Sequence, residues 1–137
     1  MKAVIDANVA AALLLDLAYS GAARQAVSGA DRLIAPDLVV HEFTNALQRL
    51  IAGGKITESF AHQALGGLDM LVGDLVAGQT LAHEALRLAA ELRHPAYDCF
   101  YLALALGRDC PLLTADRRFA ERMARSEFAS LVQLIAA

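Results

Sequence analysis

The sequence predicts an α/β fold in which helices cover both faces of a parallel sheet. Short apolar runs alternate along the chain with longer segments whose apolar residues recur at helical spacing. The turns between them are short, and the chain has no internal repeat, low-complexity stretch or linker. We therefore expect one domain over residues 1–137, folded as a three-layer α/β/α sandwich with a central parallel sheet.

The first quarter of the chain reads as a strand followed by two helices. Residues 2–6 form an apolar run up to an acid, which is typical of a central parallel strand. Asn8 is expected to cap a helix over residues 9–17. The Ser20-Gly21 pair then predicts a turn before a short helix over residues 22–28.

A second strand and two longer helices are expected next. Residues 32–35 are suited to a strand, and Pro36 opens a strongly amphipathic helix that runs to about residue 51. Gly53-Gly54 ends that helix, and residues 57–71 predict another. The stretch 72–78 is ambiguous between a brief strand and a connector.

The last third repeats the alternation. A helix over residues 80–92 is stopped by His94-Pro95, and residues 96–106 are apolar on nearly every side, as in a buried helix. Residues 110–114 predict a strand, residues 116–125 a helix and residues 130–135 a last strand.

Composition favours a protein that buries part of its surface against a partner. Apolar residues make up 57% of the chain and mean hydropathy is +0.43, which is high for a soluble monomer. The mostly apolar segments 9–17 and 43–51 exceed the needs of one small core, so we expect a homodimer that uses them.

Membrane insertion is not expected. No apolar run approaches the roughly 18 residues of a spanning helix. Lys2 with Asp6 close behind fits a signal peptide poorly, so a cytoplasmic protein is expected. The net charge of −3 means that binding of nucleic acid would rest on a local basic patch or on a metal ion.

Four carboxylates occupy positions where a folded chain usually avoids a charge. Asp6 closes the first strand, and Asp116 follows the apolar run of a later one. Glu42 lies beside the apolar stripe of its helix, and Asp98 falls in the first turn of an almost wholly apolar helix. Each has a structural explanation, such as helix capping by Asp116. Ligands of open parallel sheets bind beyond the carboxyl ends of the strands, however, which is where these acids are expected to meet.

Convergence of four acids implies a cation. Two unit charges at ~4 Å repel by roughly 4 kcal/mol at an effective dielectric of 20. A hard divalent ion relieves this repulsion, and Mg²⁺ or Mn²⁺ suits an all-carboxylate site. Such an ion can activate a water and stabilise the charge of a phosphodiester transition state. Asn8 and Thr114 are short polar neighbours that are expected to orient an acid or hold a metal-bound water.

Four stretches of the sequence carry a resemblance to a known family. They are Val4-Ile5-Asp6-Ala7-Asn8-Val9, Pro36-Asp37-Leu38 with Glu42, Tyr97-Asp98-Cys99-Phe100-Tyr101-Leu102-Ala103-Leu104-Ala105, and Leu113-Thr114-Ala115-Asp116-Arg117-Arg118-Phe119. In this order and at these spacings the chain resembles the PIN-domain ribonucleases, and among them the VapC-type toxins of bacterial toxin–antitoxin pairs.

The resemblance implies a Mg²⁺- or Mn²⁺-dependent endoribonuclease, usually dimeric and blocked by a cognate antitoxin protein. By motif match, the acidic catalytic and metal-binding positions fall on Asp6, Glu42, Asp98 and Asp116, with Asn8 and Thr114 in support. Some relatives carry a further acid a few residues beyond the last of these. Here Arg117, Arg118 and Phe119 follow Asp116, which leaves a second metal position in doubt.

The helix after Asp116 carries a basic face. Helical spacing places three arginines on one side, with a fourth alongside: Arg118, Arg122 and Arg125, with Arg117. These residues are candidates to bind the phosphates of RNA, although a solvated face tempered by Glu121 and Glu127 is an equal alternative. The four histidines are scattered in the sequence and indicate no site.

Two other interpretations remain open at this point. An Asp-based phosphatase would need a second carboxylate close to the first and a downstream lysine. Position 8 is Asn, however, and Lys2 and Lys55 are the only lysines. A catalytically silent module that keeps the fold and binds RNA or a protein is the other alternative, which the presence of all four acids disfavours.

Overall fold

The computed structural model describes residues 1–135, so the last two residues of the expected domain lie outside the described part. Five strands form one sheet in the order β3–β2–β1–β4–β5, and each neighbouring pair is parallel. The predicted parallel sheet is confirmed, and the ambiguous stretch 72–78 contains its edge strand. The strands are β1 (Lys2–Ile5), β2 (Arg32–Pro36), β3 (Asp74–Val76), β4 (Leu112–Thr114) and β5 (Val132–Leu134).

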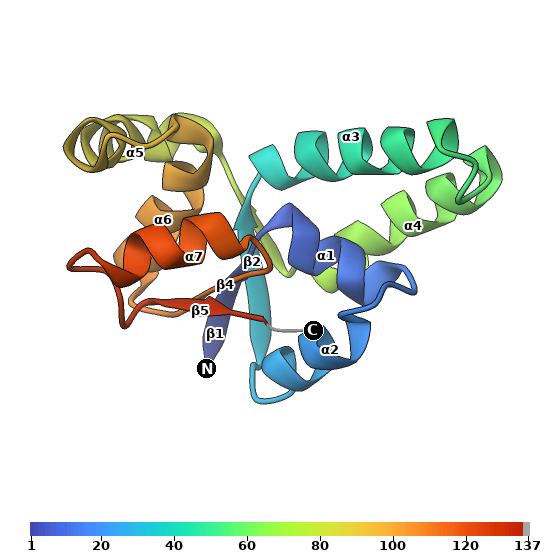
Figure 1. Ribbon diagram of the computed structural model, residues 1–137, viewed down its shortest axis with the longest axis horizontal. Coiled ribbons are helices and arrows are strands. Elements are labelled where there is room, and N and C mark those ends of the chain that lie inside the picture. The colour runs from blue at the N-terminus through green and yellow to red at the C-terminus, as the bar shows by residue number, and fades with distance from the viewer. Residues whose placement is uncertain (136–137) are drawn as a thin grey trace.

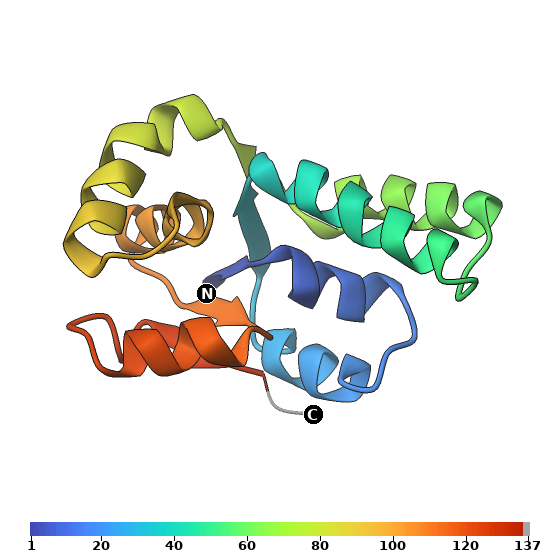
Figure 2. The ribbon, with the colours of Figure 1, turned by 45° about the horizontal axis from the view of Figure 1, so that its top comes forward.

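Helices cover both faces of this sheet (Figures 1 and 2). Four of them lie on one face: α1 (Ala7–Leu14), α2 (Ser20–Val27), α3 (Leu38–Ala52) and α4 (Glu58–Leu71). The other face carries α5 (Gly78–Leu92), α6 (Ala96–Arg108) and α7 (Arg117–Ala124). Connections that step toward β3 therefore run on one face of the sheet, and connections that step toward β5 run on the other. Right-handed crossovers require this arrangement. The predicted three-layer sandwich is confirmed.

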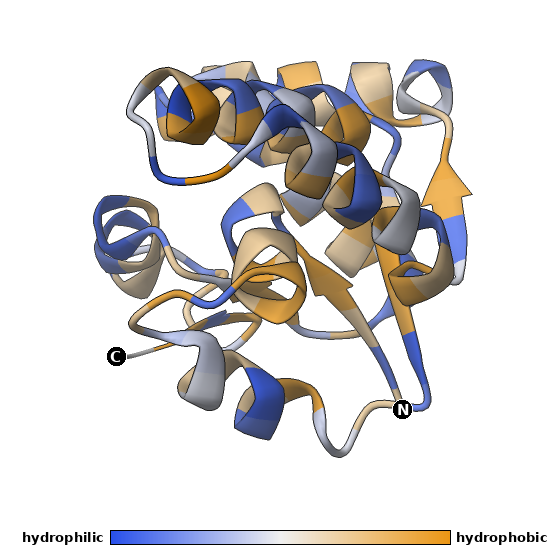
Figure 3. Cartoon of the chain, turned by 90° about the vertical axis from the view of Figure 1, so that its right-hand side faces the viewer, coloured by the Kyte–Doolittle hydropathy of each residue, from blue (hydrophilic) through white to orange (hydrophobic). Residues whose placement is uncertain are grey.

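The core lies between the sheet and its two helical layers. Figure 3 shows hydrophobic stretches on the strands, while the helices alternate between hydrophobic and hydrophilic residues. Val4 and Ile34 are fully buried at the centre of the sheet, and Leu102 is fully buried on α6. Helix α6 packs across β1, β2 and β4, which explains why its sequence is apolar on nearly every side.

Several element ends differ from the sequence prediction. Asp6, and not Asn8, caps α1: its Oδ1 accepts a hydrogen bond of 2.9 Å from the backbone N–H of Val9. Asn8 instead lies inside the first turn, with its side chain exposed. A carboxylate caps a helix as well as an amide does, so the pattern alone could not separate the two.

The apolar segments assigned to a dimer interface largely pack within the chain itself, so less of their surface remains for a partner than the sequence suggested. Residues 9–12 of α1 are buried in the protein's own core, as are Phe43 and Leu47 of α3. Their neighbours Leu50 and Ile51 pack against that core as well. The surplus of apolar residues arises because α1 has α2, α3 and α4 around it as well as the sheet.

Within residues 1–135, no helix combines the length and the apolar character that crossing a bilayer requires.

Candidate active site

Two of the acids are brought together by the pairing of β1 with β4. Asp6 directly follows β1, and Asp116 lies two residues beyond β4. Because Ile5 pairs in parallel with Leu113, the chain leaves both strands at the same edge. Thr114, which is fully buried, joins them: its hydroxyl donates to Oδ2 of Asp6 and accepts a 3.0 Å hydrogen bond from the backbone N–H of Asp116.

The other two acids reach the same edge from opposite faces of the sheet. Glu42 comes from α3 and Asp98 from the first turn of α6. The Tyr101 hydroxyl of α6 donates a 2.6 Å hydrogen bond to Oε1 of Glu42, which ties the two helices together over the edge of the sheet.

All four predicted acids line one pocket of about 230 Å³. Its other lining residues are Ala7, Asn8, Asn45, Ala46, Arg49 and Tyr101. The convergence inferred from the sequence is therefore present in the fold.

The electrostatics of the pocket follow from burial and mutual repulsion. Burial raises the pKa of Asp6 to about 6, with smaller contributions from the charges of Asp98 and Glu42, while the bonds from Thr114 and Val9 oppose the rise. Burial also raises the pKa of Glu42, and the charge of Asp98 adds to this against the bond from Tyr101. The pocket thus disfavours negative charge, the condition that a bound cation would relieve.

An acid in this structure can cap a helix and line the pocket at the same time. Asp116 does cap α7, since its Oδ1 accepts a 3.1 Å bond from the backbone N–H of Phe119, as the simpler interpretation expected. It nevertheless lines the pocket with the other acids. Asp6 behaves in the same way at α1. Helix capping fixes each side chain at the sheet edge, so the two roles are not alternatives.

The predicted supporting residues differ in their contacts. The Thr114 hydroxyl bonds both Asp6 and the backbone of Asp116. Asn8 lines the pocket, but its side chain is exposed, and its hydrogen bond runs from the Tyr19 hydroxyl to its backbone carbonyl at 3.4 Å.

Four residues of the site were not among those predicted from the sequence. Asn45 and Arg49 lie three and seven positions after Glu42, on the same side of α3, so helical spacing would have indicated them. Tyr101 lies within one of the four motif stretches, which gave it no role. His94 is one of the scattered histidines, yet its Nε2 lies 2.7 Å from Oδ2 of Asp98, a contact across the α5–α6 turn.

A cleft lined by three arginines and three acids adjoins the acid pocket. It has a volume of about 520 Å³ and shares Asp98 and Asp116 with the pocket. Its remaining lining residues are His94, Pro95, Arg118, Phe119, Glu121, Arg122 and Arg125. Arg117 is not among them. The predicted basic face is therefore divided, with three arginines on the cleft and Arg117 outside it.

The acids suit a divalent ion in kind but are not arranged around one. Within residues 1–135, no group of three acidic, histidine or cysteine side chains is close enough to hold a metal ion as it stands. Each acid keeps at least one oxygen in a protein hydrogen bond, to the Thr114 hydroxyl and Val9 N–H, the Tyr101 hydroxyl, the His94 ring or the Phe119 N–H. Oxygen donors of this type match Mg²⁺ and Mn²⁺, and binding would draw the carboxylates closer.

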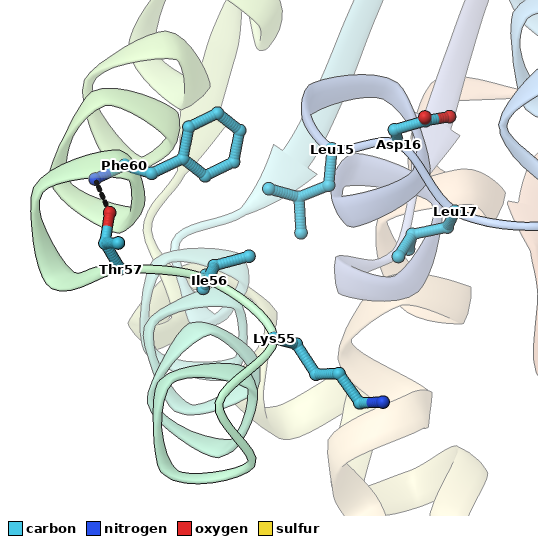
Figure 4. A pocket seen from close by; sticks show the side chains of 7 residues that line it. All are labelled: Leu15, Asp16, Leu17, Lys55, Ile56, Thr57 and Phe60. Carbon is cyan, nitrogen blue, oxygen red and sulfur yellow. Dashed lines mark hydrogen bonds between the residues drawn. The ribbon is translucent and has the colours of Figure 1, made fainter.

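A larger groove lies away from the acids, between the end of α1 and the start of α4 (Figure 4). Leu15, Ile56 and Phe60 point toward its interior, and Asp16 and Lys55 are its charged lining residues. Its volume is about 610 Å³, and Phe60 is 44% exposed there. Of the four acids described above, none lines this groove.

With this geometry in place, comparison with known proteins assigns the family. A family profile described as PIN domain matches residues 3–124, and the chain belongs to this family. The resemblance noted in the sequence is thereby confirmed, and the phosphatase interpretation has no support from it.

The relatives of this chain are named as ribonucleases. It is 34% identical over 118 residues to the VapC ribonuclease Mb0985 of Mycobacterium bovis, covering 86% of this chain and 88% of that protein. It is also 34% identical over 124 residues to ribonuclease VapC3 of Pyrobaculum aerophilum, covering 89% and 95%.

A solved structure supports the fold. The crystal structure of PAE2754 from Pyrobaculum aerophilum superposes with a TM-score of 0.68 at 24% identity, covering 94% of this chain and 90% of that chain.

Proposed function

We propose that this protein is a metal-dependent endoribonuclease that hydrolyses RNA phosphodiester bonds and serves as the toxin of a toxin–antitoxin pair. The observation that carries the proposal is the convergence of Asp6, Glu42, Asp98 and Asp116 in one pocket at the carboxyl edge of the sheet. The names of its relatives, VapC ribonucleases that match most of the chain, support the RNA substrate.

The four acids would hold Mg²⁺ or Mn²⁺, which supplies an activated water and neutralises charge on the phosphate. The protein's own groups position these acids. Thr114 fixes one oxygen of Asp6, and Tyr101 fixes one oxygen of Glu42. Both donors come from buried side chains, so they hold the carboxylates in place without solvent competing for the same oxygen.

The arginines of the cleft would bind the RNA strand next to the scissile bond. Arg118 and Arg125 line it beside Asp98 and Asp116, so phosphates bound there would lie close to the acids. Arg49 lines the acid pocket from α3 and would offer a cation on the opposite wall. Guanidinium groups suit this task because they bind phosphate oxygens through paired hydrogen bonds.

The proposed inhibitor is a co-expressed antitoxin protein. The acid pocket would accept an Arg or Lys from such a partner, which would replace the cation. The apolar groove in Figure 4 would accept an amphipathic segment of the same partner.

A homodimer and a cytoplasmic location complete the proposal. Large apolar side chains on α5 and α6 remain exposed, among them Leu86 at 64% and Tyr97 at 65%, and these are better candidates for a dimer contact than α1. A mass measurement in solution scattering at micromolar concentration decides between monomer and dimer. We propose that the protein acts in the cytoplasm because its proposed substrate is RNA.

Cleavage of RNA with and without metal is the central test. The wild type should cleave single-stranded RNA in Mn²⁺ or Mg²⁺ and lose this activity in chelator. Asp6→Ala, Glu42→Ala and Asp98→Ala should each reduce cleavage by several orders of magnitude, since a misplaced ion removes both nucleophile and charge stabilisation. Arg87→Ala, on an exposed face of α5 among Glu84 and Glu91, is the matched control and should cleave normally. Full cleavage in chelator would refute the metal mechanism.

The same variants test the toxin role. Expression of the wild type alone should arrest growth, Asp6→Ala should not, and the protein encoded beside it should restore growth and co-purify. Harmless expression of soluble, cleavage-competent wild type would refute the toxin role and leave the nuclease proposal intact.

A further inference from the structure

We infer that His94 is a positioning residue for Asp98: it holds one oxygen of this acid and leaves the other for the metal and substrate. The inference rests on the proposed nuclease function. It concerns a side chain that is neither an acid nor part of the sequence motifs.

The contact between the two side chains is short and partly sheltered. Nε2 of His94 lies 2.7 Å from Oδ2 of Asp98, four residues later, and the histidine side chain is only 15% exposed. A carboxylate can only accept, so Nε2 is the donor when Asp98 is ionised. Within residues 1–135, Oδ1 of Asp98 accepts no protein hydrogen bond, and the side chain lines the acid pocket. The geometry therefore separates a held oxygen from an available one.

Packing against α7 holds the His94 ring in place. The ring lies against Phe119 of α7, with centroids 5.3 Å apart and planes tilted by 47°. Phe119 is buried, and its backbone N–H donates to Asp116. One aromatic contact thus connects the residue that holds Asp98 to the residue that holds Asp116. The contact therefore connects the turn before α6 to α7, the two elements that carry Asp98 and Asp116 at their starts.

A second contact anchors the same turn. Arg122 of α7 donates to the backbone carbonyl of Leu92, the last residue of α5. The next residue, Arg93, adopts a left-handed conformation with φ of 52°, which turns the chain toward His94 and Pro95. The His94 ring therefore approaches Asp98 from a turn held by α7.

This arrangement resembles the hydrogen bonds that commonly support metal ligands. Outer partners orient a ligating group, and their loss typically costs 10- to 100-fold in metal affinity or activity. Without His94, the Asp98 side chain would be free to rotate away from Asp6 and Glu42, whose charges repel it. His94 therefore opposes the spreading of the acid cluster.

Two substitutions separate hydrogen bonding from packing. His94→Phe keeps an aromatic ring against Phe119 and removes the nitrogen donor. His94→Gln retains an amide nitrogen near the position of Nε2. The control is His62→Phe on α4, whose ring contacts Glu58 at 3.2 Å with the same i, i+4 spacing but on an exposed surface away from the acids. Denaturant unfolding of all three proteins measures any loss of fold.

The readouts are Mn²⁺ affinity by calorimetry and the steady-state constants for RNA cleavage. His94→Phe should bind Mn²⁺ about 10-fold more weakly and lose about 10- to 100-fold in kcat, with a smaller change in KM. His94→Gln should recover most of both losses, and His62→Phe should match the wild type. Wild-type Mn²⁺ affinity and kcat in His94→Phe would overturn the inference. A His94→Gln protein as impaired as His94→Phe, at equal unfolding stability, would overturn it too.

Failure of the proposed function would look different. It would show in the wild type alone, either as no cleavage of RNA in the presence of metal or as cleavage that persists in chelator. The inference about His94 is decided by the comparison of the variants in the Mn²⁺ titration.

Discussion

Thr114 donates its hydroxyl hydrogen to Asp6 across the junction of β4 and β1 and, through the same oxygen, accepts the backbone N–H of Asp116. One buried hydroxyl thus links the Asp6 carboxylate to the backbone of Asp116, 110 residues later in the chain. The parallel pairing of Ile5 with Leu113 delivers the three residues to one place. Strand pairing brings the two acids to one edge of the sheet, and the Thr114 side chain connects the Asp6 side chain to the Asp116 backbone there.

Thr114→Val should destabilise the protein and alter the acid pocket without changing the shape of the side chain. The valine leaves an oxygen of Asp6 and the N–H of Asp116 without partners, at a cost of about 1–3 kcal/mol in the free energy of unfolding. The Thr114 bond lowers the pKa of Asp6, so its loss should raise that pKa further above about 6. Denaturant unfolding and an NMR titration of the Asp6 carboxyl measure the two effects. Thr114→Ser, which keeps the hydroxyl, should remain near the wild type in both.

Acidification should stabilise the metal-free protein relative to Asp6→Asn. The pKa of Asp6 is about 6 in the fold and near 3.8 when unconstrained, so the folded state binds more protons between these values. The contribution of Asp6 to the free energy of unfolding therefore falls as pH rises from about 4 to 6. At pH 7 the ionised Asp6 destabilises the fold. The effect is on the order of 2–3 kcal/mol, at 1.36 kcal/mol for each unit of pKa.

The measurement is the free energy of unfolding from pH 4 to pH 8 in chelator. Asn keeps the helix cap without the charge, so Asp6→Asn should be the more stable protein at pH 7 and should lose this advantage toward pH 4. A difference between the two proteins that does not change with pH would contradict the burial of this charge.

Much of the fold was predictable because its signals are local. Continuous apolar runs marked β1, β2 and β4, helical spacing marked α3 and α5, and apolar residues on nearly every side marked α6. The strand that the sequence predicted least clearly was β3. It is a three-residue edge strand whose residues are only partly buried or exposed. A strand this short is stabilised by pairing with β2 and not by its own composition, so its sequence carries little information.

The meeting of the four acids in one pocket was predictable, but their hydrogen-bond partners were not. An acid beside an apolar run is conspicuous, whereas Tyr101 within an apolar helix has the expected composition of a core residue. Its bond to Glu42 joins residues 59 positions apart, which no spacing indicates. Many apolar residues assigned to the dimer interface lie in the core, because hydropathy cannot tell an apolar face buried by neighbouring helices from one left exposed.

Asp116 should prove to have two separable roles. Asp116→Ala removes both the helix cap and a pocket carboxylate, and loss of such a cap costs about 1 kcal/mol in the free energy of unfolding. Asp116→Asn keeps the capping oxygen and should retain nearly wild-type stability. Both variants should nevertheless lose most RNA cleavage, because each removes the negative charge that would help to hold the metal ion. Thermal unfolding paired with cleavage rates makes the distinction, and a fully active Asp116→Asn would exclude this carboxylate from the chemistry.

The arginines of α7 should differ in their effect on RNA binding according to whether they line the cleft. Arg118→Ala and Arg125→Ala remove cleft cations, so each should weaken binding and make the slope of log K against log salt shallower by about 0.7 for each phosphate that is no longer bound. Arg117→Ala changes the charge equally but lies outside the cleft, which makes it the matched control. Arg122 is unsuitable for this comparison because it also bonds Leu92.

Fluorescence anisotropy of a labelled single-stranded RNA in chelator, measured over a range of KCl concentrations, yields these slopes. Without metal there is no cleavage to distort the binding curves, so the anisotropy reports binding of the intact strand. Arg118→Ala and Arg125→Ala should bind more weakly than Arg117→Ala at every salt concentration, and the differences should narrow as salt screens the phosphates. Equal weakening in all three variants would show that the net charge of the helix, and not the cleft, governs binding.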